Sequence, residues 1–305
     1  MNSGPVIALV GATATGKTPL AERVAERLGG EVVCADSRQV FRRLEIGTGK
    51  PPPAERAARP HHLFDALEIG EPASAGWYAR AAAGAVVEIR ARGALPVLVG
   101  GSGFYLAAVM EGLAAMPPVN PKTRHRLAAE LDTLGLEAMH RRLAEVDPVT
   151  AARLATRDTQ RILRALEVHS STGRPLSAWH EAAREPAFQA DWRIYEMVLE
   201  PALLKERIAA RTAAMFAGGL IEETRALIDE GFGAALHQLR AIGYDEALER
   251  IAGTLSPEEA EERTTKRTIQ LARRQRTWLR HQIEAEPLDA REPVAGLAER
   301  IAAGG

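Results

Sequence analysis

The feature that most constrains the fold of this chain is a segment near its start, VIALVGATATGKT, which runs from Val6 to Thr18. Its opening run of apolar residues is typical of a strand that is buried on both faces of a parallel sheet. Residues Gly11 to Thr18 then match the pattern G-x-x-x-x-G-K-[ST] of a phosphate-binding loop. A helix is expected from Thr18 to about Leu28. The segment therefore predicts an α/β fold with a P-loop-type parallel sheet.

Each kind of residue in this loop can help to hold phosphate. The two glycines let the backbone wrap closely around an anion, and the loop N–H groups can donate to it. Lys17 adds a positive charge, the Thr18 hydroxyl can bind Mg²⁺, and the following helix directs the positive end of its dipole at the anion. We therefore expect phosphate or diphosphate to be bound by Gly11, Ala12, Thr13, Ala14, Thr15, Gly16, Lys17 and Thr18.

Two further segments are expected at the same edge of the sheet. A short strand, Glu31 to Ala35, is followed directly by Asp36, and a buried strand, Leu95 to Val99, is followed by a glycine-rich turn that contains Ser102. Ligands of parallel α/β sheets bind at the carboxyl ends of the strands, so Asp36 should lie beside the phosphate loop. An ordinary helix-cap or turn role for Asp36 is the alternative.

Composition excludes several classes of protein. The chain has 305 residues, is 46% hydrophobic and carries a net charge of −1, so it can build a large core but has no overall basic field for nucleic acid. Cys34 is the one cysteine in the sequence, which excludes a disulfide framework and a cysteine-based zinc site. We expect no signal peptide and no membrane span, and hence a cytoplasmic protein.

The chain is predicted to form a core with a helical insertion. Residues from Pro121 to about Glu185 are strand-poor and helical in pattern, and a strand-like segment, Trp192 to Leu199, follows. The predicted core is 1–116 with 190–305, and the predicted insertion is 117–189. The pair His61 and His62 is better explained by packing or capping than by a metal site, because no third ligand is nearby at helical or hairpin spacing.

Basic side chains gather in two places. Arg161 and Arg164 share a helix face within the predicted insertion. A long helix from Pro257 to about Ile283 opens with acids and continues with seven bases, among them Arg273 and Arg274. The dipole explains part of this order. These faces are either simply solvated or in contact with RNA phosphates.

At this point the chain resembles the tRNA dimethylallyltransferases, also called tRNA isopentenyltransferases, along nearly its whole length. The motifs that carry the resemblance are GATATGKT, DSRQVF with LEIGTGKP, HHLFD, LVGGSGFY, DTQRILRALEV, RAIGY and TIQLARRQRTWLR. The resemblance implies transfer of a dimethylallyl group from dimethylallyl diphosphate to N6 of adenosine 37, just 3′ of the anticodon in certain tRNAs. It also implies Mg²⁺, release of diphosphate without ATP hydrolysis, and an insertion that contacts the anticodon stem-loop.

The resemblance also implies roles for individual residues. Lys17, Thr18 and Arg211 would act on the diphosphate, with Thr18 as the metal ligand, and Asp36 would be the general base. Ser102, which stands where the family usually has threonine, and Arg124 would lie near the substrate. The residues expected to contact tRNA are Asp36, Ser37, Arg38, Gln39, Ser102, Arg124, Gln160, Arg161, Ile162, Leu163, Arg164, Arg240, Ala241, Ile242, Gly243, Tyr244 and Asp245, with Arg273 and Arg274 from the basic helix.

Three other functions are also compatible with a phosphate-binding loop. A P-loop kinase for a nucleotide or small molecule would use ATP, but it would not need a large helical insertion or a basic helix. An RNA-binding NTPase should have another strand-end Asp besides the one in EVVCAD. Prenyl transfer to free AMP would not need RNA-facing segments. We expect a monomer that binds tRNA and dimethylallyl diphosphate.

Overall fold

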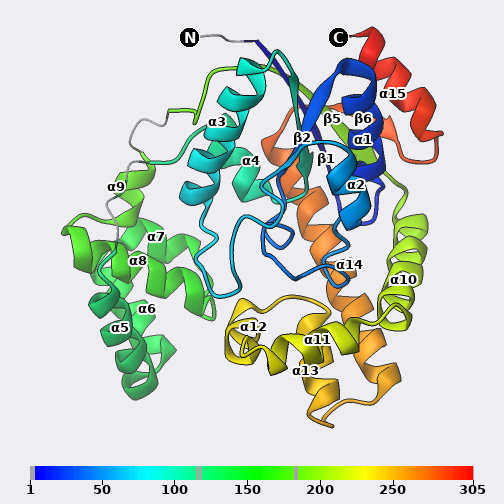
Figure 1. Ribbon diagram of the computed structural model, residues 1–305. Helices are drawn as coiled ribbons and strands as arrows, with labels where there is room; N and C mark the ends of the chain where they lie inside the picture. Colours follow the sequence, from blue (N-terminus) through cyan, green and yellow to red (C-terminus); the bar gives the residue numbers. More distant parts are fainter. Residues whose placement is uncertain (1–3, 115, 117–118, 182–184, 305) are drawn as a thin grey trace. The chain divides into compact units, whose positions relative to one another are not determined.

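A parallel sheet forms the centre of the computed structural model, which describes residues 4–114, 116, 119–181 and 185–304 (Figure 1). Within these ranges the sheet has six strands in the order β3-β2-β4-β1-β5-β6, and every neighbouring pair is parallel. The strands are β1 Pro5–Gly11, β2 Gly30–Cys34, β3 His61–His62, β4 Leu95–Gly100, β5 Asp191–Val198 and β6 Glu286–Asp289. The predicted α/β class with a parallel sheet is confirmed.

Helices cover both faces of this sheet. The chain crosses from β1 to β2 in one direction and from β3 to β4 in the other, so right-handed crossovers place their helices on opposite faces. Figure 1 shows α3 and α4 on one side of the strands and α1 and α15 on the other. These helices are α1 Lys17–Leu28, α3 Ala75–Ala91, α4 Gly103–Met110 and α15 Val294–Ala303, and the short α2 Pro53–Ala58 lies between β2 and β3 in the chain.

Further helices lie between β5 and β6 in the chain: α10 Pro201–Ala217, α11 Leu220–Asp229, α12 Gly233–Leu239, α13 Tyr244–Ile251 and α14 Pro257–Gln282. The longest of them, α14, starts at a capping box in which Ser256 and Glu259 satisfy each other's backbone N–H groups. The predicted helix from Pro257 is present. Residues 240–243 separate α12 from α13, and neither of these two helices was predicted.

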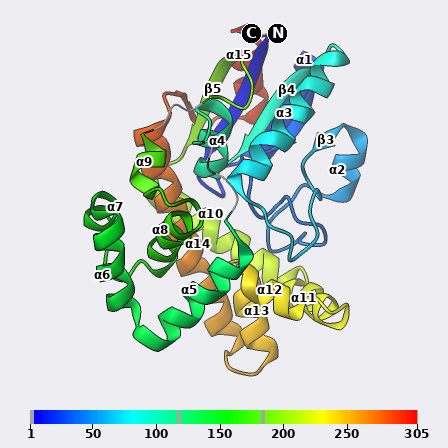
Figure 2. The same ribbon diagram turned by 90° about the vertical axis from the view of Figure 1, so that its left-hand side faces the viewer.

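Residues 111–185 form a separate helical unit (Figure 2). Its helices are α5 Pro121–Leu134, α6 Leu136–Val146, α7 Pro148–Arg153, α8 Thr159–Thr172 and α9 Leu176–His180. They enclose a hydrophobic core of their own, built from Leu127, Met139, Leu143, Ala151, Ile162, Ala165 and Leu166. The unit therefore has the internal packing of an independent domain.

The rest of the chain, up to Met110 and from Pro186 onward, is the core unit. Its two segments meet where the helical unit begins and ends, because the Ala187 N–H donates to the Val109 carbonyl at 3.1 Å. The insertion was predicted at 117–189, and its first residue lies outside the described ranges. The compact helical unit of the structure spans residues 111–185. Among the described residues, no helix has the length and apolar character to cross a membrane.

Candidate active site

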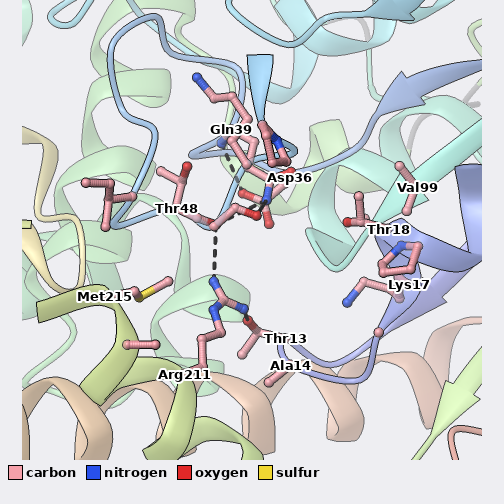
Figure 3. A pocket seen from close by; sticks show the side chains of 18 of the residues that line it. Thr13, Ala14, Lys17, Thr18, Asp36, Gln39, Thr48, Val99, Arg211 and Met215 are labelled. Atoms are coloured by element: carbon pink, nitrogen blue, oxygen red, sulfur yellow. Dashed lines mark hydrogen bonds between the residues drawn. The ribbon is translucent and has the colours of Figure 1, made fainter. Parts of the chain in front are cut away.

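A cavity of about 690 Å³ opens at the carboxyl ends of β1, β2 and β4. Figure 3 shows Lys17, Asp36 and Arg211 around it, from the phosphate loop, the end of β2 and α10. All of its lining residues belong to the core unit. They are Thr13, Ala14, Gly16, Lys17, Thr18, Pro19, Asp36, Gln39, Ile46, Thr48, Gly49, Lys50, Pro52, Val99, Gly100, Arg211, Ala214, Met215 and Gln275.

The phosphate loop is held in shape by its own side chains. The Thr15 hydroxyl and the Lys17 ammonium both donate to the Ala12 carbonyl, at 2.9 and 2.5 Å. Desolvation lowers the pKa of Lys17 to about 8; the Asp36 carboxylate opposes this shift and the Arg211 guanidinium adds to it. An anion in the cavity would favour the charged form of Lys17. The charged form of Lys17 is therefore disfavoured by burial, as expected for a group that would pair with an anion.

Arg211 reaches the cavity from α10 and joins two loops. It donates to the Thr13 hydroxyl at 2.9 Å and to the Thr48 carbonyl at 3.2 Å. Gly49 gives it room, because a Cβ atom there would lie 2.6 Å from the Arg211 guanidinium. Burial lowers the pKa of Arg211, and Asp36 opposes the shift. A second cation is therefore fixed beside the phosphate loop.

Asp36 lines the cavity with the phosphate loop, at the place predicted for it. Its Oδ1 accepts from the N–H groups of Arg38 and Gln39, at 2.8 and 3.3 Å. Within the described ranges no hydrogen bond engages Oδ2. The turn role and the base role are therefore compatible: one oxygen holds the turn, and the other is able to accept a proton.

Ser102 supports the Asp36 turn from the end of β4. Its hydroxyl accepts from the Ser37 N–H at 2.9 Å, and its own N–H donates to the Ala35 carbonyl at 3.3 Å. Ser102 is not among the residues that line the cavity. Its position favours orienting Asp36 over contacting the reacting atoms.

An ionic cluster around the buried Lys50 holds the loop that contributes Thr48 and Gly49 to the cavity lining. Lys50 has a fully buried side chain and donates to the Phe41 carbonyl at 2.7 Å and to Asp65 at 2.5 Å. Arg56 pairs with Glu45 at 2.7 Å and Asp65 at 3.3 Å in the same cluster. The motifs LEIGTGKP and HHLFD therefore contribute support for the cavity wall.

The two histidines of HHLFD pack as structural residues. His61 bonds to the Glu22 carboxylate, and His62 bonds to Glu31 at 2.6 Å. No group of three His, Cys, Asp or Glu side chains that could hold a metal occurs in the described part of the chain. The predicted packing role agrees with these contacts.

Two segments of the core unit are expected to contact tRNA, and the first holds the half-buried residues Arg38 and Gln39. Arg38 is half-buried; burial lowers its pKa, which the charges of Asp36, Tyr105 and Asp245 oppose. Gln39 donates to the carbonyls of Thr48 and Gly49, at 3.1 and 3.2 Å.

The stretch from Arg240 to Asp245 is mostly buried. Arg240 is exposed and Ile242 half-buried, whereas Ala241, Gly243, Tyr244 and Asp245 are buried. The Tyr244 hydroxyl donates to Glu223 and accepts from the Gly47 N–H at 3.3 Å, so this side chain supports the cavity loop. Asp245 pairs with Arg267 at 2.8 Å. Direct RNA contact from these two side chains does not fit their burial.

In the helical unit, two of the bases expected at tRNA pair with the same acid. The buried Glu167 pairs with Arg124 at 3.2 Å and with Arg164 at 3.6 Å. Gln160 and Arg161 are exposed at the start of α8. Ile162 is fully buried and Leu163 packs against the same core, so their side chains serve the unit's packing.

Five of the seven basic residues of α14 fall into two groups. Arg263 and Arg267 pair with acids of α13, and Lys266 pairs with Glu262 on its own helix. Arg273 and Arg274 are exposed, and among the described residues neither has a carboxylate partner. They line a surface hollow of about 410 Å³ together with Thr277, Trp278, His281 and Gln282.

Some residues of the cavity were not predicted from the sequence as site residues. Gln275 joins α14 to the phosphate loop, and Ile46, Val99, Ala214 and Met215 give the cavity apolar walls. Gln275 lies within the motif TIQLARRQRTWLR, but its partners are 262 and 174 residues away in the chain. Local pattern carries no signal for such contacts.

Comparisons with known proteins point to one family. A family model described as IPP transferase matches residues 39–282, and one described as isopentenyl transferase matches residues 4–70. The chain is 46% identical over 287 residues to the tRNA dimethylallyltransferase of Halorhodospira halophila, with 92% of each chain covered. It is 43% identical over 305 residues to that of Xanthomonas campestris, covering 97% of this chain and 93% of the relative.

Solved structures agree with these sequence matches. The full-length tRNA isopentenylpyrophosphate transferase from Bacillus halodurans has a TM-score of 0.70 and 32% identity, covering 98% of this chain and 96% of that one. A eukaryotic dimethylallyltransferase acting on tRNA has a TM-score of 0.78 and 26% identity, covering 95% of this chain and 74% of that one.

Proposed function

Because the chain belongs to the tRNA dimethylallyltransferase family, we propose that it transfers a dimethylallyl group from dimethylallyl diphosphate to N6 of A37 in tRNA. One observation carries this proposal for the site itself. The phosphate-loop motif, a carboxylate and apolar walls meet in a single cavity. These are the parts that a diphosphate leaving group, an amine proton and an allyl chain each require.

The residues of the cavity account for the proposed reaction. The bond between the allyl C1 and the diphosphate oxygen breaks, and a bond between N6 and C1 forms. Lys17, Arg211 and the loop N–H groups oppose the negative charge that develops on the departing diphosphate. Asp36 Oδ2 accepts the N6 proton as the new bond forms, because an exocyclic adenine amine is a weak nucleophile.

We propose Mg²⁺ as the cofactor. The donor set fits it: the Thr18 hydroxyl lines the cavity beside Lys17, and Mg²⁺ is commonly held by one or two protein oxygens together with substrate phosphates and water. The lack of a three-ligand acidic or histidine cluster in the described residues agrees with a metal held mainly by the substrate. When bound, the ion would neutralise diphosphate charge.

The target adenine must leave the stacked anticodon loop to enter the cavity, as in other enzymes that modify a base. We propose that Arg38, Gln39, Arg240, Arg273 and Arg274 contact tRNA from the core unit. From the helical unit we propose Arg124, Gln160, Arg161 and Arg164. One chain supplies all of these groups, so a monomer acting on cytoplasmic tRNA is sufficient.

The test is to incubate the protein with tRNA, dimethylallyl diphosphate and Mg²⁺, digest the RNA and identify nucleosides by mass. The expected product is N6-dimethylallyl adenosine, formed equally well with and without ATP. Free AMP in place of tRNA should give no product. Product that requires ATP, or ADP released from ATP without tRNA, would support the kinase alternative and contradict the proposal.

A further inference from the structure

Gln275 lines the cavity and lies between the loops that follow β1 and β4. The Thr13 N–H of the phosphate loop donates to its Oε1 at 2.8 Å, and its Nε2 donates to the Gly101 carbonyl at 2.9 Å. Both ends of the amide are used, so its orientation is fixed. One side chain of α14 therefore ties together the loops that follow β1 and β4.

The turn after β4 is packed tightly against this amide. A Cβ atom at Gly101 would lie 2.5 Å from Gln275 Nε2 and 2.8 Å from the Gly11 carbonyl oxygen. Only a residue without a side chain allows this approach. The turn after β4 therefore packs directly against both the Gly11 carbonyl and the Gln275 amide.

Further hydrogen bonds link each of these two loops toward a residue that is proposed to act in the reaction. The Thr13 hydroxyl accepts from Arg211 at 2.9 Å, on the diphosphate side. Gly101 precedes Ser102, whose hydroxyl accepts from the Ser37 N–H at 2.9 Å beside Asp36. A shift of Gln275 would therefore change the spacing between the diphosphate loop and the Asp36 turn.

We propose that Gln275 is a positioning residue for the transfer reaction. It holds the phosphate loop and the Asp36 turn at the separation that the reaction needs. The inference rests on the proposed function. Because transfer needs the allyl carbon and the adenine amine close together and aligned, a displacement of about 1 Å is enough to cost up to ~100-fold in rate.

The test compares Gln275→Met, Gln275→Ala and a control, Gln270→Ala, at an exposed glutamine of the same helix. Methionine fills a similar volume without either hydrogen bond. We expect both Gln275 variants to lose ~10- to ~100-fold in single-turnover rate at saturating tRNA and donor, with thermal midpoints close to wild type. The Gln270 variant should match wild type.

A purely structural role predicts the opposite pattern, in which Gln275→Met is fully active or loses rate only in proportion to its loss of stability. Either result would overturn the inference. Amide exchange in the unaltered protein gives a check without variants: the Thr13 N–H should be protected, and exchange at the rate of an unbonded loop amide would contradict it. If wild type transfers no prenyl group at all, the proposed function fails instead.

Discussion

Burial disfavours the positive charge of Lys17, which we expect an anion in the cavity to stabilise. This lysine lies in a desolvated loop beside a second cation, Arg211, and its pKa is lowered to about 8. Lys17→Ala should lose about 2–4 kcal/mol of transition-state stabilisation, measured as kcat/KM for the donor, because a preorganised donor to the leaving group is removed. Lys205→Ala, at an exposed lysine of α10, is the control. A Lys17 variant with wild-type kcat/KM would remove the Lys17 side chain from the mechanism.

His61 makes stability depend on pH. Burial lowers its pKa, but hydrogen bonds to Glu22 and to the Arg59 carbonyl, at 2.9 Å, outweigh burial and raise it overall. The folded protein therefore holds this proton more tightly than the unfolded chain does. The stabilisation is complete below the unfolded pKa of about 6.5 and is lost as pH rises through the higher folded value.

Urea unfolding across this pH range should show the free energy of unfolding falling as pH rises above about 6.5. Glu22→Gln should flatten that slope, and His237→Asn, at an exposed histidine of α12, should leave it unchanged. A slope that persists in Glu22→Gln would assign the pH dependence to other groups.

Helix α14 carries two exposed arginines, Arg273 and Arg274, which are available to bind a polyanion. Replacing Arg273 and Arg274 by Gln should weaken tRNA binding and reduce its salt dependence by about 0.9 in log–log slope per lost phosphate contact. The same result is expected for Arg161 and Arg164 on α8. Lys266→Gln, at a lysine paired with its own helix, is the control. Unchanged affinity and slope would leave these residues as solvated faces.

The elements that could be predicted are those with a strong local pattern. β1 and β4 are continuous apolar runs, and α14 begins at a capping box with Pro257 in its first turn. Short elements escaped prediction: β3 has two residues, β6 has four, and α12 and α13 have seven and eight. Such pieces depend on tertiary contacts, because isolated helices of this length are unstable.

In the site too, the residues that could be predicted are those with a local sequence signal, whereas residues placed by long-range contacts could not. The phosphate loop is one contiguous motif, and Asp36 follows a strand, so both could be placed from the sequence. Tyr244 was expected at tRNA but is buried against the cavity loop, and Gln275 was missed. Sequence pattern names the residues of a family motif, but it does not distinguish those that support the site from those that meet the substrate.

For the whole molecule, the two compact units should be separable in function. Residues 111–185 can be replaced by a short Gly-Ser linker, because Val109 and Ala187 are already hydrogen-bonded to each other. The shortened protein should bind diphosphate within a few-fold of wild type, measured by calorimetry, because the cavity lies in the core unit. It should lose transfer to tRNA. Wild-type transfer by this variant would show that the helical unit is dispensable.

We propose that Asp36 is the base in a cavity where diphosphate and adenine meet. Asp36→Asn retains an oxygen that can accept from the Arg38 and Gln39 N–H groups but cannot take a proton. Single-turnover transfer at saturating tRNA and donor, measured beside a thermal melt and diphosphate binding, tests it most directly. We predict a fall of ~10²-fold or more in rate, with stability and diphosphate affinity little changed. A rate within a few-fold of wild type would contradict the claim and place the base elsewhere.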